Sequence, residues 1–366
     1  MTLSDRIRAE AVNLGFDLVG IASARRALTA DAFHGWLNRS YHGEMAWLGR
    51  DPERRCDPRR VLPAARSVVV VGVSYFVRDP EPEVWDDPLR GRVARYAWGR
   101  DYHKVIERRL RDLGDFIRRE ATGDFAMKAY VDYGPVLERE AAARAGLGFV
   151  GKNTLLISPR LGSYTFLAEI LLSLDLEPDP PLPSDSADGP DALAALTEGR
   201  GTCGACTRCQ TVCPTHAFPA AWVLDSRRCI SYLTIEHRGD LPVELRPRMG
   251  RWVFGCDECQ SVCPWVKQFS APASRPWLAY DPDWAAPRLD ELLALDDAGF
   301  LARFAGSPLM RPKRGGLLRN AAVALANGGH PDALAVAERA ARDPDPLVAR
   351  HAGWAVKVLR GGASEP

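Results

Sequence analysis

The first 176 residues alternate between amphipathic stretches and short apolar runs. In the amphipathic stretches apolar side chains recur every three or four positions, as in Ile7, Ala11 and Leu14, which is helical spacing. The apolar runs are rich in β-branched side chains, as buried strands are. This alternation predicts an α/β core. The pattern places helices at about residues 4–14, 31–48 and 103–117, strands at about residues 16–22, 67–75 and 128–132, and a further apolar element at residues 163–172.

The pattern changes twice after this core. Residues 177–200 are rich in Pro, Asp, Ser and Gly, the composition of an exposed linker or surface insertion. Beyond Pro264 the chain becomes helical, and residues 317–359 predict three helices, of which the outer two share an Ala-rich face. They resemble a short HEAT-type repeat, a fold that offers a concave binding surface. The predicted domains are residues 1–176 (α/β), 177–200 (linker), 201–275 (cysteine-rich) and 276–366 (helical).

Composition places the chain among ordinary globular proteins. Of 366 residues, 46% are hydrophobic and 26% charged, and 48 Lys and Arg against 47 Asp and Glu leave a net charge of +1. This balance argues neither for nor against nucleic acid, because a local basic face can bind phosphate without changing the total. No apolar run approaches the roughly 18 residues of a membrane span, and no secretory apolar segment opens the chain. We expect a cytoplasmic monomer that is not bound to a membrane.

Eight of the nine cysteines lie between positions 203 and 263 in two related runs. The first has the bacterial ferredoxin spacing C-x2-C-x2-C-x3-C-P, and the second has the same spacing without its leading cysteine. In two-cluster ferredoxins three closely spaced thiolates hold one 4Fe-4S cluster, and the cysteine before the proline binds the other. The spacing therefore predicts two clusters. We expect Cys203, Cys206, Cys209 and Cys263 to hold the first, and Cys213, Cys229, Cys256 and Cys259 to hold the second.

Zinc and disulfides are the alternatives to these clusters. Paired C-x2-C motifs also build structural zinc sites. The third cysteine of the first run and the proline after each terminal cysteine favour clusters. Disulfides are disfavoured because a dense thiol set in a cytosolic protein usually binds metal. Cys56 has no assigned role, and we expect it to be a buried free thiol.

Candidate chemistry in the first domain lies next to its strands. Asp132 ends the predicted strand at residues 128–132, and the carboxyl ends of strands are where ligands bind in α/β folds. It could act as an acid there, or it could cap the helix that starts near Pro135. The polar cluster Asp101 to His103 is interpreted as a helix cap. We expect no histidine ligand to cobalt, because Ile106 stands where the glycine of a D-x-H-x-x-G cobalamin motif would be.

Two further segments could bind a ligand. The glycines between residues 146 and 151 allow close approach of a large ligand, although the spacing is not that of a P-loop. Residues 229–237 carry a predicted cluster ligand and several polar side chains, and they could touch whatever the clusters reduce or serve as a packed spacer. A basic run opens the C-terminal helices and could be a solvated face or a phosphate contact. Its members are Arg311, Lys313, Arg314 and Arg319.

Taken together, several segments resemble the epoxyqueuosine reductase family over about residues 5–360. They are residues 95–103, 131–138, 145–154 and 229–236, the cysteine set and the C-terminal helical repeat. The segment at residues 177–200 looks longer than the family's usual connection. The resemblance implies a nitroreductase-like cobalamin-binding domain, a ferredoxin-like domain with two 4Fe-4S clusters and a HEAT-like region that binds tRNA.

The activity implied by the resemblance is the last step of queuosine biosynthesis. Members reduce the epoxide of epoxyqueuosine to queuosine at the wobble position of a tRNA anticodon stem-loop. An external low-potential donor would supply electrons through the clusters to cobalamin. By resemblance Asp132 is the acid for the departing oxygen. The implied cobalamin contacts are Arg55, Asp132, Gly151, Lys152, Asn153, Thr154, Ser226, Ser231 and Thr234, and the implied tRNA contacts are Arg311, Lys313, Arg314 and Arg319.

Two other functions remain open at this point. Another corrinoid iron-sulfur reductase, such as a reductive dehalogenase-like enzyme, would share the electron path but need no tRNA surface. A non-enzymatic two-cluster electron carrier would need no bound corrinoid. The helical C-terminal region favours the tRNA-dependent enzyme over the first alternative.

Overall fold

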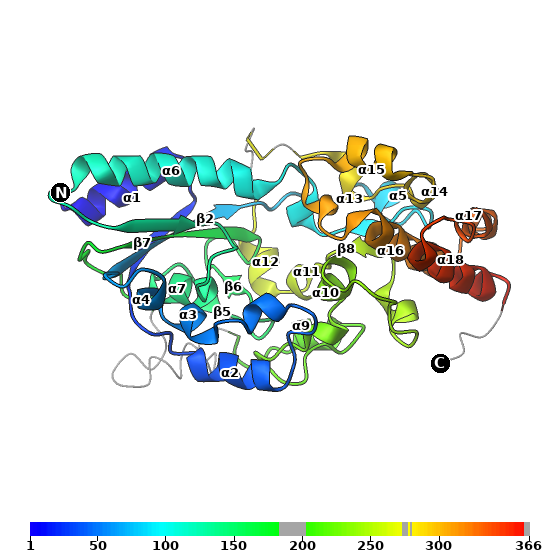
Figure 1. Cartoon of the computed structure of the whole chain (residues 1–366), viewed down its shortest axis with the longest axis horizontal. Coiled ribbons are helices and arrows are strands. Elements are labelled where there is room, and N and C mark those ends of the chain that lie inside the picture. The colour runs from blue at the N-terminus through cyan, green and yellow to red at the C-terminus, as the bar shows by residue number, and fades with distance from the viewer. Residues whose placement is uncertain (183–202, 273–276, 279, 362–366) are drawn as a thin grey trace.

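The computed structural model describes residues 1–182, 203–272, 277–278 and 280–361 (Figure 1). Most of the predicted linker at residues 177–200 lies outside these residues. Its described beginning is tied to the sheet, because the Asp179 side chain accepts a hydrogen bond from the Ile21 N–H at 2.7 Å and pairs with Arg8 at 2.8 Å. No helix among the described residues is both long and apolar enough to cross a lipid bilayer.

A four-stranded sheet forms the centre of the N-terminal half. Its order is β1 (Leu18–Ser23), β2 (Ser67–Ser74), β7 (Thr165–Leu172) and β4 (Met127–Tyr130), and every neighbouring pair is antiparallel. This half is therefore α+β, with no alternating parallel sheet. β2 is buried along its whole length, because helices cover both faces of the sheet and leave no polar side to its valine run.

The two faces of the sheet have different covers (Figure 1). Helices α1 (Leu3–Asn13) and α6 (Tyr102–Glu120) pack on one face, where Ile7 and Leu113 meet Val69 and Ile170. Helix α7 (Glu138–Arg144) packs on the other face against Val70, Leu167 and Leu171. The strand side chains alternate between these two cores, so the odd-numbered side chains from 167 to 171 point toward α7.

One predicted helix of the N-terminal half is wrong. The stretch at residues 31–48 forms α2, which ends at Asn38, and a separate short helix, η1. Ser40 and Gly43 between them have positive φ values of 55° and 58°, which a continuing helix does not allow. The remaining elements here are α2 (Ala30–Asn38), η1 (Ala46–Leu48), α3 (Pro52–Cys56), α4 (Pro58–Val61), α5 (Pro82–Trp85), β3 (Arg92–Val93), η2 (Arg95–Ala97), β5 (Phe149–Val150) and β6 (Leu156–Ile157).

The cysteine-rich region consists of short elements. They are α9 (Arg208–Val212), η3 (Ser226–Arg228), α10 (Ile230–Ile235), η4 (Arg246–Met249), β8 (Trp252–Phe254), α11 (Glu258–Ser261) and α12 (Pro264–Phe269). Strand β8 pairs in parallel with β3. A segment of the N-terminal half is thereby built into the cysteine-rich region.

The C-terminal region is helical, as predicted. Its elements are α13 (Pro282–Ala285), α14 (Leu289–Leu293), α15 (Asp297–Phe304), η5 (Pro308–Met310), α16 (Lys313–Gly328), α17 (Ala333–Ala340) and α18 (Pro346–Leu359). Helix α16 is buried from Gly316 to Ala326, since α14, α17, α18 and β8 surround it. Figure 1 shows this region at the opposite end of the molecule from α1.

Candidate functional site

The structure brings the first predicted set of cysteines together. Cys203, Cys206, Cys209 and Cys263 line one cavity, in which Cys209 lies on α9 and Cys263 is the N-cap residue of α12. Burial raises the pKa of the Cys209 thiol to about 11, and the charges of Cys203 and Cys263 contribute in the same direction. Four thiols that share one cavity in this way fit the ligand set of a 4Fe-4S cluster.

The second predicted set is also close together. Burial raises the pKa of Cys256, and so do the charges of Cys259 and Cys229. The pKa of Cys259 is likewise raised by burial and then by charges that include those of Cys229 and Cys213. The charge of Cys209, which belongs to the first set, also raises the pKa of Cys259, so the two sets are neighbours. Eight thiols in two adjoining groups fit two clusters, and this includes Cys229, which lies outside both runs.

Two residues predicted to contact cobalamin also support the cysteine loops. Lys152 donates from Nζ to the carbonyls of Gly204 at 2.6 Å and Cys206 at 3.1 Å. Asn153 donates from Nδ2 to the Cys259 carbonyl at 3.3 Å. These two neighbours therefore connect the α+β half to both groups of cysteines.

The predicted contacts on α10 and η3 differ in how far they are available. Thr234 is fully buried, donates from Oγ1 to the Ile230 carbonyl at 2.7 Å and accepts from the Gly255 N–H at 2.9 Å. Ser226 is buried, and its N–H donates to the Tyr41 carbonyl at 2.9 Å. Ser231 remains half-buried on α10. Thr234 and Ser226 are thus internal supports, and the expectation that they touch cobalamin does not fit their burial.

Asp132 lies on an exposed loop between β4 and α7. Its φ of 60° is in the left-handed region, and its side chain accepts a hydrogen bond from the Tyr102 hydroxyl. The Tyr102 ring stacks between Phe166 and His103, with centroid separations of 4.0 and 4.1 Å, so the donor is held in place. Helix α7 starts at Glu138 after Leu137 as its cap. Asp132 therefore does not cap this helix, and its carboxyl is not used in helix capping.

Two carboxyls missed by the sequence analysis adjoin Asp132. Burial raises the pKa of Glu138 well above its usual range, and the charges of Asp132 and Glu169 raise it further. Burial raises the pKa of Glu169 to about 8, with a further contribution from Asp132. Arg55 lies beside them, since its Nη1 donates to the Gly134 carbonyl at 3.2 Å. The sequence does contain one signal for Glu169, because it is the single charged residue in the apolar run at residues 165–172.

Aromatic side chains connect the Asp132 loop with the second group of cysteines. The Tyr96 ring lies 6.2 Å from Tyr102 and 5.7 Å from Phe254, which is followed by Gly255 and Cys256. Burial raises the pKa of Tyr96, and the charge of Asp132 adds to the shift. Tyr96 and Tyr102 also line a cavity shared with Arg95, Tyr75 and Tyr280. This aromatic path connects Asp132 with the second group of cysteines.

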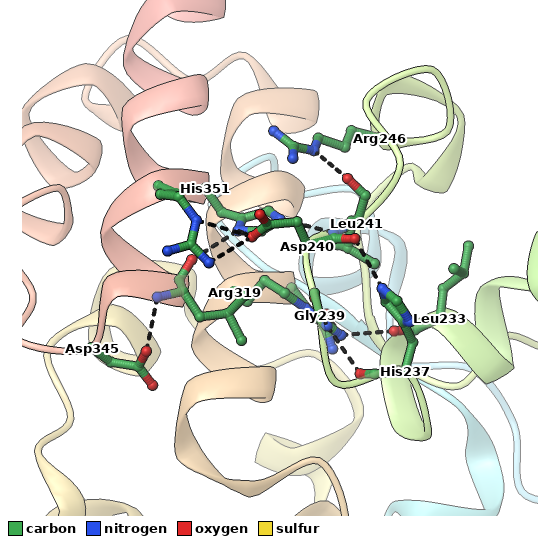
Figure 2. Close-up of polar contacts among 12 residues, drawn as sticks. Leu233, His237, Gly239, Asp240, Leu241, Arg246, Arg319, Asp345 and His351 are labelled. Carbon is green, nitrogen blue, oxygen red and sulfur yellow. Dashed lines mark hydrogen bonds and ion pairs between the residues drawn. The ribbon is translucent and has the colours of Figure 1, made fainter. Parts of the chain in front are cut away.

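The four predicted tRNA contacts lie in different environments. Arg311 is exposed, pairs with Glu236 at 3.1 Å and lies over the Trp47 ring at 5.4 Å, and Lys313 is exposed. Arg314 is mostly buried and pairs with Asp343. Arg319 is fully buried and donates to the carbonyls of Leu233, His237 and Gly239 (Figure 2). The expectation for Arg319 is therefore corrected: it holds the loop after α10 and does not face solvent.

The structure also shows where the remaining residues singled out in the sequence lie. Gly151 and Thr154 lie beside the start of α7, because Arg139 donates from Nη1 to the Thr154 carbonyl at 2.9 Å. Cys56 is fully buried as a free thiol, as predicted. Asp101 caps α6 by accepting a hydrogen bond from the His103 N–H at 3.1 Å, which confirms the cap interpretation.

Comparisons with known proteins agree with this arrangement. The family model described as "Epoxyqueuosine reductase QueG, DUF1730" matches residues 55–133, and that of a 4Fe-4S double cluster binding domain matches residues 202–266. An epoxyqueuosine reductase of Xanthomonas campestris pv. campestris is 41% identical over 96% of this chain and 94% of its own length. The corresponding protein of Escherichia coli K12 is 36% identical over 97% and 89%.

Solved structures give the same result. A crystal structure of epoxyqueuosine reductase with a tRNA-Tyr epoxyqueuosine-modified stem loop has a TM-score of 0.85 at 31% identity and covers 98% of this chain and 90% of its own. The enzyme of Bacillus subtilis, with its catalytic aspartate loop swung out of the active site, has a TM-score of 0.84 at 31% identity, with coverage of 98% and 90%.

Proposed function

The chain belongs to the epoxyqueuosine reductase family, and from this premise we propose how its residues carry out that reduction. It is an oxidoreductase with a 4Fe-4S double-cluster domain. Its substrate is the epoxide of epoxyqueuosine at the wobble position of a tRNA anticodon, and its product is the cyclopentene of queuosine. The observation that carries the proposal is the exposed Asp132 carboxyl, joined by an aromatic path to two adjoining groups of four cysteines.

The cysteines would bind two clusters in the sets that the structure brings together. Cys203, Cys206, Cys209 and Cys263 surround the first, and Cys213, Cys229, Cys256 and Cys259 surround the second. Such clusters pass electrons singly, which suits a two-electron reduction fed by an external low-potential donor. The second set lies next to Phe254 and Tyr96, so it is the set nearer to Asp132 along the aromatic path.

Cobalamin fits best at the Asp132 end of this path. Arg55 and Asp132 on neighbouring segments and Thr154 beside α7 offer polar groups there, and half-buried Ser231 on α10 could approach the cofactor from the cysteine-rich region. Lys152, Asn153 and Thr234 are committed to the cysteine region and would act only through it. When bound, cobalamin supplies a low-potential cobalt centre for reduction of the epoxide.

Asp132 would protonate the departing epoxide oxygen. Its carboxyl is exposed, whereas its partner Tyr102 is buried, so substrate can reach the acid while the tyrosine orients it. A base held in an anticodon must leave its stack to reach such a site. Arg311 and Lys313 would then contact the tRNA backbone at the entrance to α16–α18, which we propose to be the HEAT-like tRNA-binding unit.

Anaerobic reconstitution with iron, sulfide and cobalamin tests the proposal. Two clusters and one corrinoid predict about eight iron atoms and one cobalt atom per chain. The loaded protein and a low-potential reductant should convert epoxyqueuosine in an anticodon stem-loop to a product lacking the epoxide oxygen. Iron without retained cobalt, together with no turnover, would instead identify an electron carrier.

A further inference from the structure

Glu169 is a buried carboxyl that the proposed mechanism has not used. It lies at 0% exposure in the middle of β7, and neither of its carboxyl oxygens has a hydrogen-bond partner among the described residues. A carboxylate buried without a partner costs several kcal/mol or more, so such a group keeps its proton. Isolated buried charge is normally avoided in a strand core. Its position in this molecule therefore calls for a reason beyond packing.

The carboxyl of Glu169 points at the loop that carries Asp132. Glu169 is the cross-strand neighbour of Tyr130, the last residue of β4 before that loop. A methyl group added to Gly134 would lie 2.7 Å from Glu169 Oε1, so the carboxyl packs directly beneath the loop backbone. Along β7 it shares the α7-facing side with Leu167 and Leu171, which brings it to the first turn of α7, where Glu138 lies.

The charges around this group leave it short of cations. Three carboxyls, those of Asp132, Glu138 and Glu169, influence one another. Arg55 from α3 and Arg139 on α7 are neighbouring guanidiniums that interact with Glu138, and burial lowers the pKa of Arg55. Among the described residues no cation contributes to the pKa of Glu169, which burial and the charge of Asp132 raise to about 8, so Glu169 retains its proton at neutral pH. The ionisable groups that face the cluster are Arg55 on α3, Tyr102 and His103 on α6, Tyr130 on β4, Tyr133 on the loop, and Glu138 and Arg139 on α7.

The reaction needs a second proton that Asp132 alone does not provide. Converting an epoxide to an alkene breaks both C–O bonds, forms the C=C π bond and releases the oxygen as water. The balance is epoxide plus two electrons plus two protons giving alkene plus water. The electrons come from the external donor through the clusters. Asp132 can give one proton and must then be recharged, or a second group must give the other.

We propose that Glu169 is the proton reserve of this site, holding a proton beneath the loop and returning one to Asp132 through Glu138. Glu169 does not touch the substrate. It holds the proton and acts on the reaction only through Glu138 and Asp132. Glu138 responds to the charges of both other carboxyls, which makes it the intermediate position. This inference rests on the proposed reduction and adds the source of its second proton.

The pH profile of the reconstituted holoenzyme tests the reserve. Wild-type kcat should fall through an inflection near pH 8, where Glu169 loses its proton. Glu169→Gln keeps the shape and neutrality of the side chain but carries no transferable proton. It should lower kcat at pH 7 by about tenfold or more with little change in KM, and the inflection near pH 8 should disappear. Glu169→Asp, which restores an ionisable carboxyl, should restore a falling limb.

Glu140→Gln is the matched control. Glu140 is also buried on α7, but it accepts hydrogen bonds from the Leu28 and Thr29 N–H groups at 2.7 and 3.0 Å. Its substitution therefore weakens hydrogen bonds that hold the structure together. It should lower stability and leave the inflection near pH 8 in place. An unchanged pH profile and kcat in Glu169→Gln would overturn the reserve while leaving the reductase intact. Wild-type protein without any epoxide reduction would instead refute the proposed function.

A direct titration does not depend on turnover. Infrared difference spectra of the full chain between pH 7 and pH 9 should show loss of a protonated carboxyl C=O band, and this band should be missing from Glu169→Gln. If wild-type protein shows no protonated carboxyl C=O band at pH 7, Glu169 is already ionised there and the proposal is wrong. This reading holds even if the Gln variant does not fold.

Discussion

At the scale of single residues, Asp132 is the side chain that we propose as the proton donor of the reaction. Asp132→Asn preserves size and can still accept the Tyr102 hydrogen bond, but it cannot give a proton to the departing oxygen. We expect the variant to retain iron and cobalt at wild-type levels and to lose turnover by about 100-fold or more. Metal analysis together with single-turnover assays on an epoxyqueuosine stem-loop measures both quantities.

Asp124→Asn serves as the control for this substitution. Asp124 is exposed in the turn before β4, on the same segment but away from the loop, and its change should leave turnover at the wild-type level. Equal turnover of wild type and Asp132→Asn would show that another group protonates the oxygen.

The residues that could be predicted from the sequence are those whose roles depend on local spacing. The predicted cysteine sets follow from the ferredoxin spacing, in which three closely spaced thiolates share one cluster and the cysteine before the proline binds the other. Arg319 and Glu169 depend on burial, which sequence spacing does not reveal. Arg319 looked like part of a basic surface run, yet it binds carbonyls inside the molecule. Glu169 looked like part of an apolar strand, yet its carboxyl lies near that of Asp132.

At the scale of elements, periodicity predicted the long helices and the central strands but not how they pair. The helix at residues 103–117 and the three C-terminal helices occur close to their expected positions. The strands were expected in an α/β alternation, yet the sheet is antiparallel throughout. An apolar run indicates a strand that is buried on both faces of its sheet. Parallel and antiparallel strands that are buried in this way have the same apolar run, so the sequence does not distinguish them. The apolar spacing of the predicted helix at residues 31–48 continues through turn residues such as Ser40. The positive φ of Ser40 interrupts the helix, and the spacing gives no sign of this.

Helix α18 provides a prediction about pH at this scale. His351 is fully buried on α18, accepts a hydrogen bond from the Leu241 N–H at 3.1 Å and donates from Nδ1 to the Leu347 carbonyl at 2.8 Å (Figure 2). Burial lowers its pKa from 6.5 to about 4. Between these values the unfolded chain binds the proton more readily, so the free energy of unfolding should decrease as the pH falls.

The expected loss from His351 between pH 7 and pH 5 is about 2 kcal/mol. Chemical denaturation of wild type and His351→Gln at both pH values measures it. The variant should be less stable at pH 7 but should lose less stability on acidification. His330→Gln, which changes a more exposed histidine at the start of the α17 turn, should keep the wild-type pH dependence. If His351→Gln and wild type lose equal stability, His351 is not the group responsible.

At the scale of the whole molecule, the site depends on segments that are far apart in the sequence. Strand β3 pairs with β8, Lys152 holds the loop of Cys203 to Cys206, and Arg319 holds the loop after α10. Because these contacts cross the expected domain boundaries, the cysteine-rich region is positioned by segments from both of its neighbouring domains. The order of predicted domains along the sequence could not provide this, since pairing over such separations leaves no periodic signal.

The position of the basic residues leads to a prediction about tRNA binding. Arg311 and Lys313 are the two exposed members of the predicted basic run. If they contact phosphates, each contact releases counterions, so the logarithm of affinity falls with the logarithm of salt concentration by about 0.7 to 0.9 per contact. Replacing both residues by Gln should weaken binding of the stem-loop at low salt and reduce that slope by about 1.5.

Fluorescence anisotropy of a labelled stem-loop across a salt series measures the slope. Arg6→Gln is the control, because Arg6 is a partly exposed arginine on α1, at the end of the molecule opposite to α16 (Figure 1). It changes net charge by one without altering the proposed contact surface, and its slope should match that of wild type. An equal decrease in affinity for Arg6→Gln would mean that overall charge attracts tRNA. An unchanged slope in the double variant would place the phosphate contacts elsewhere on the molecule and would separate the C-terminal helices from tRNA recognition.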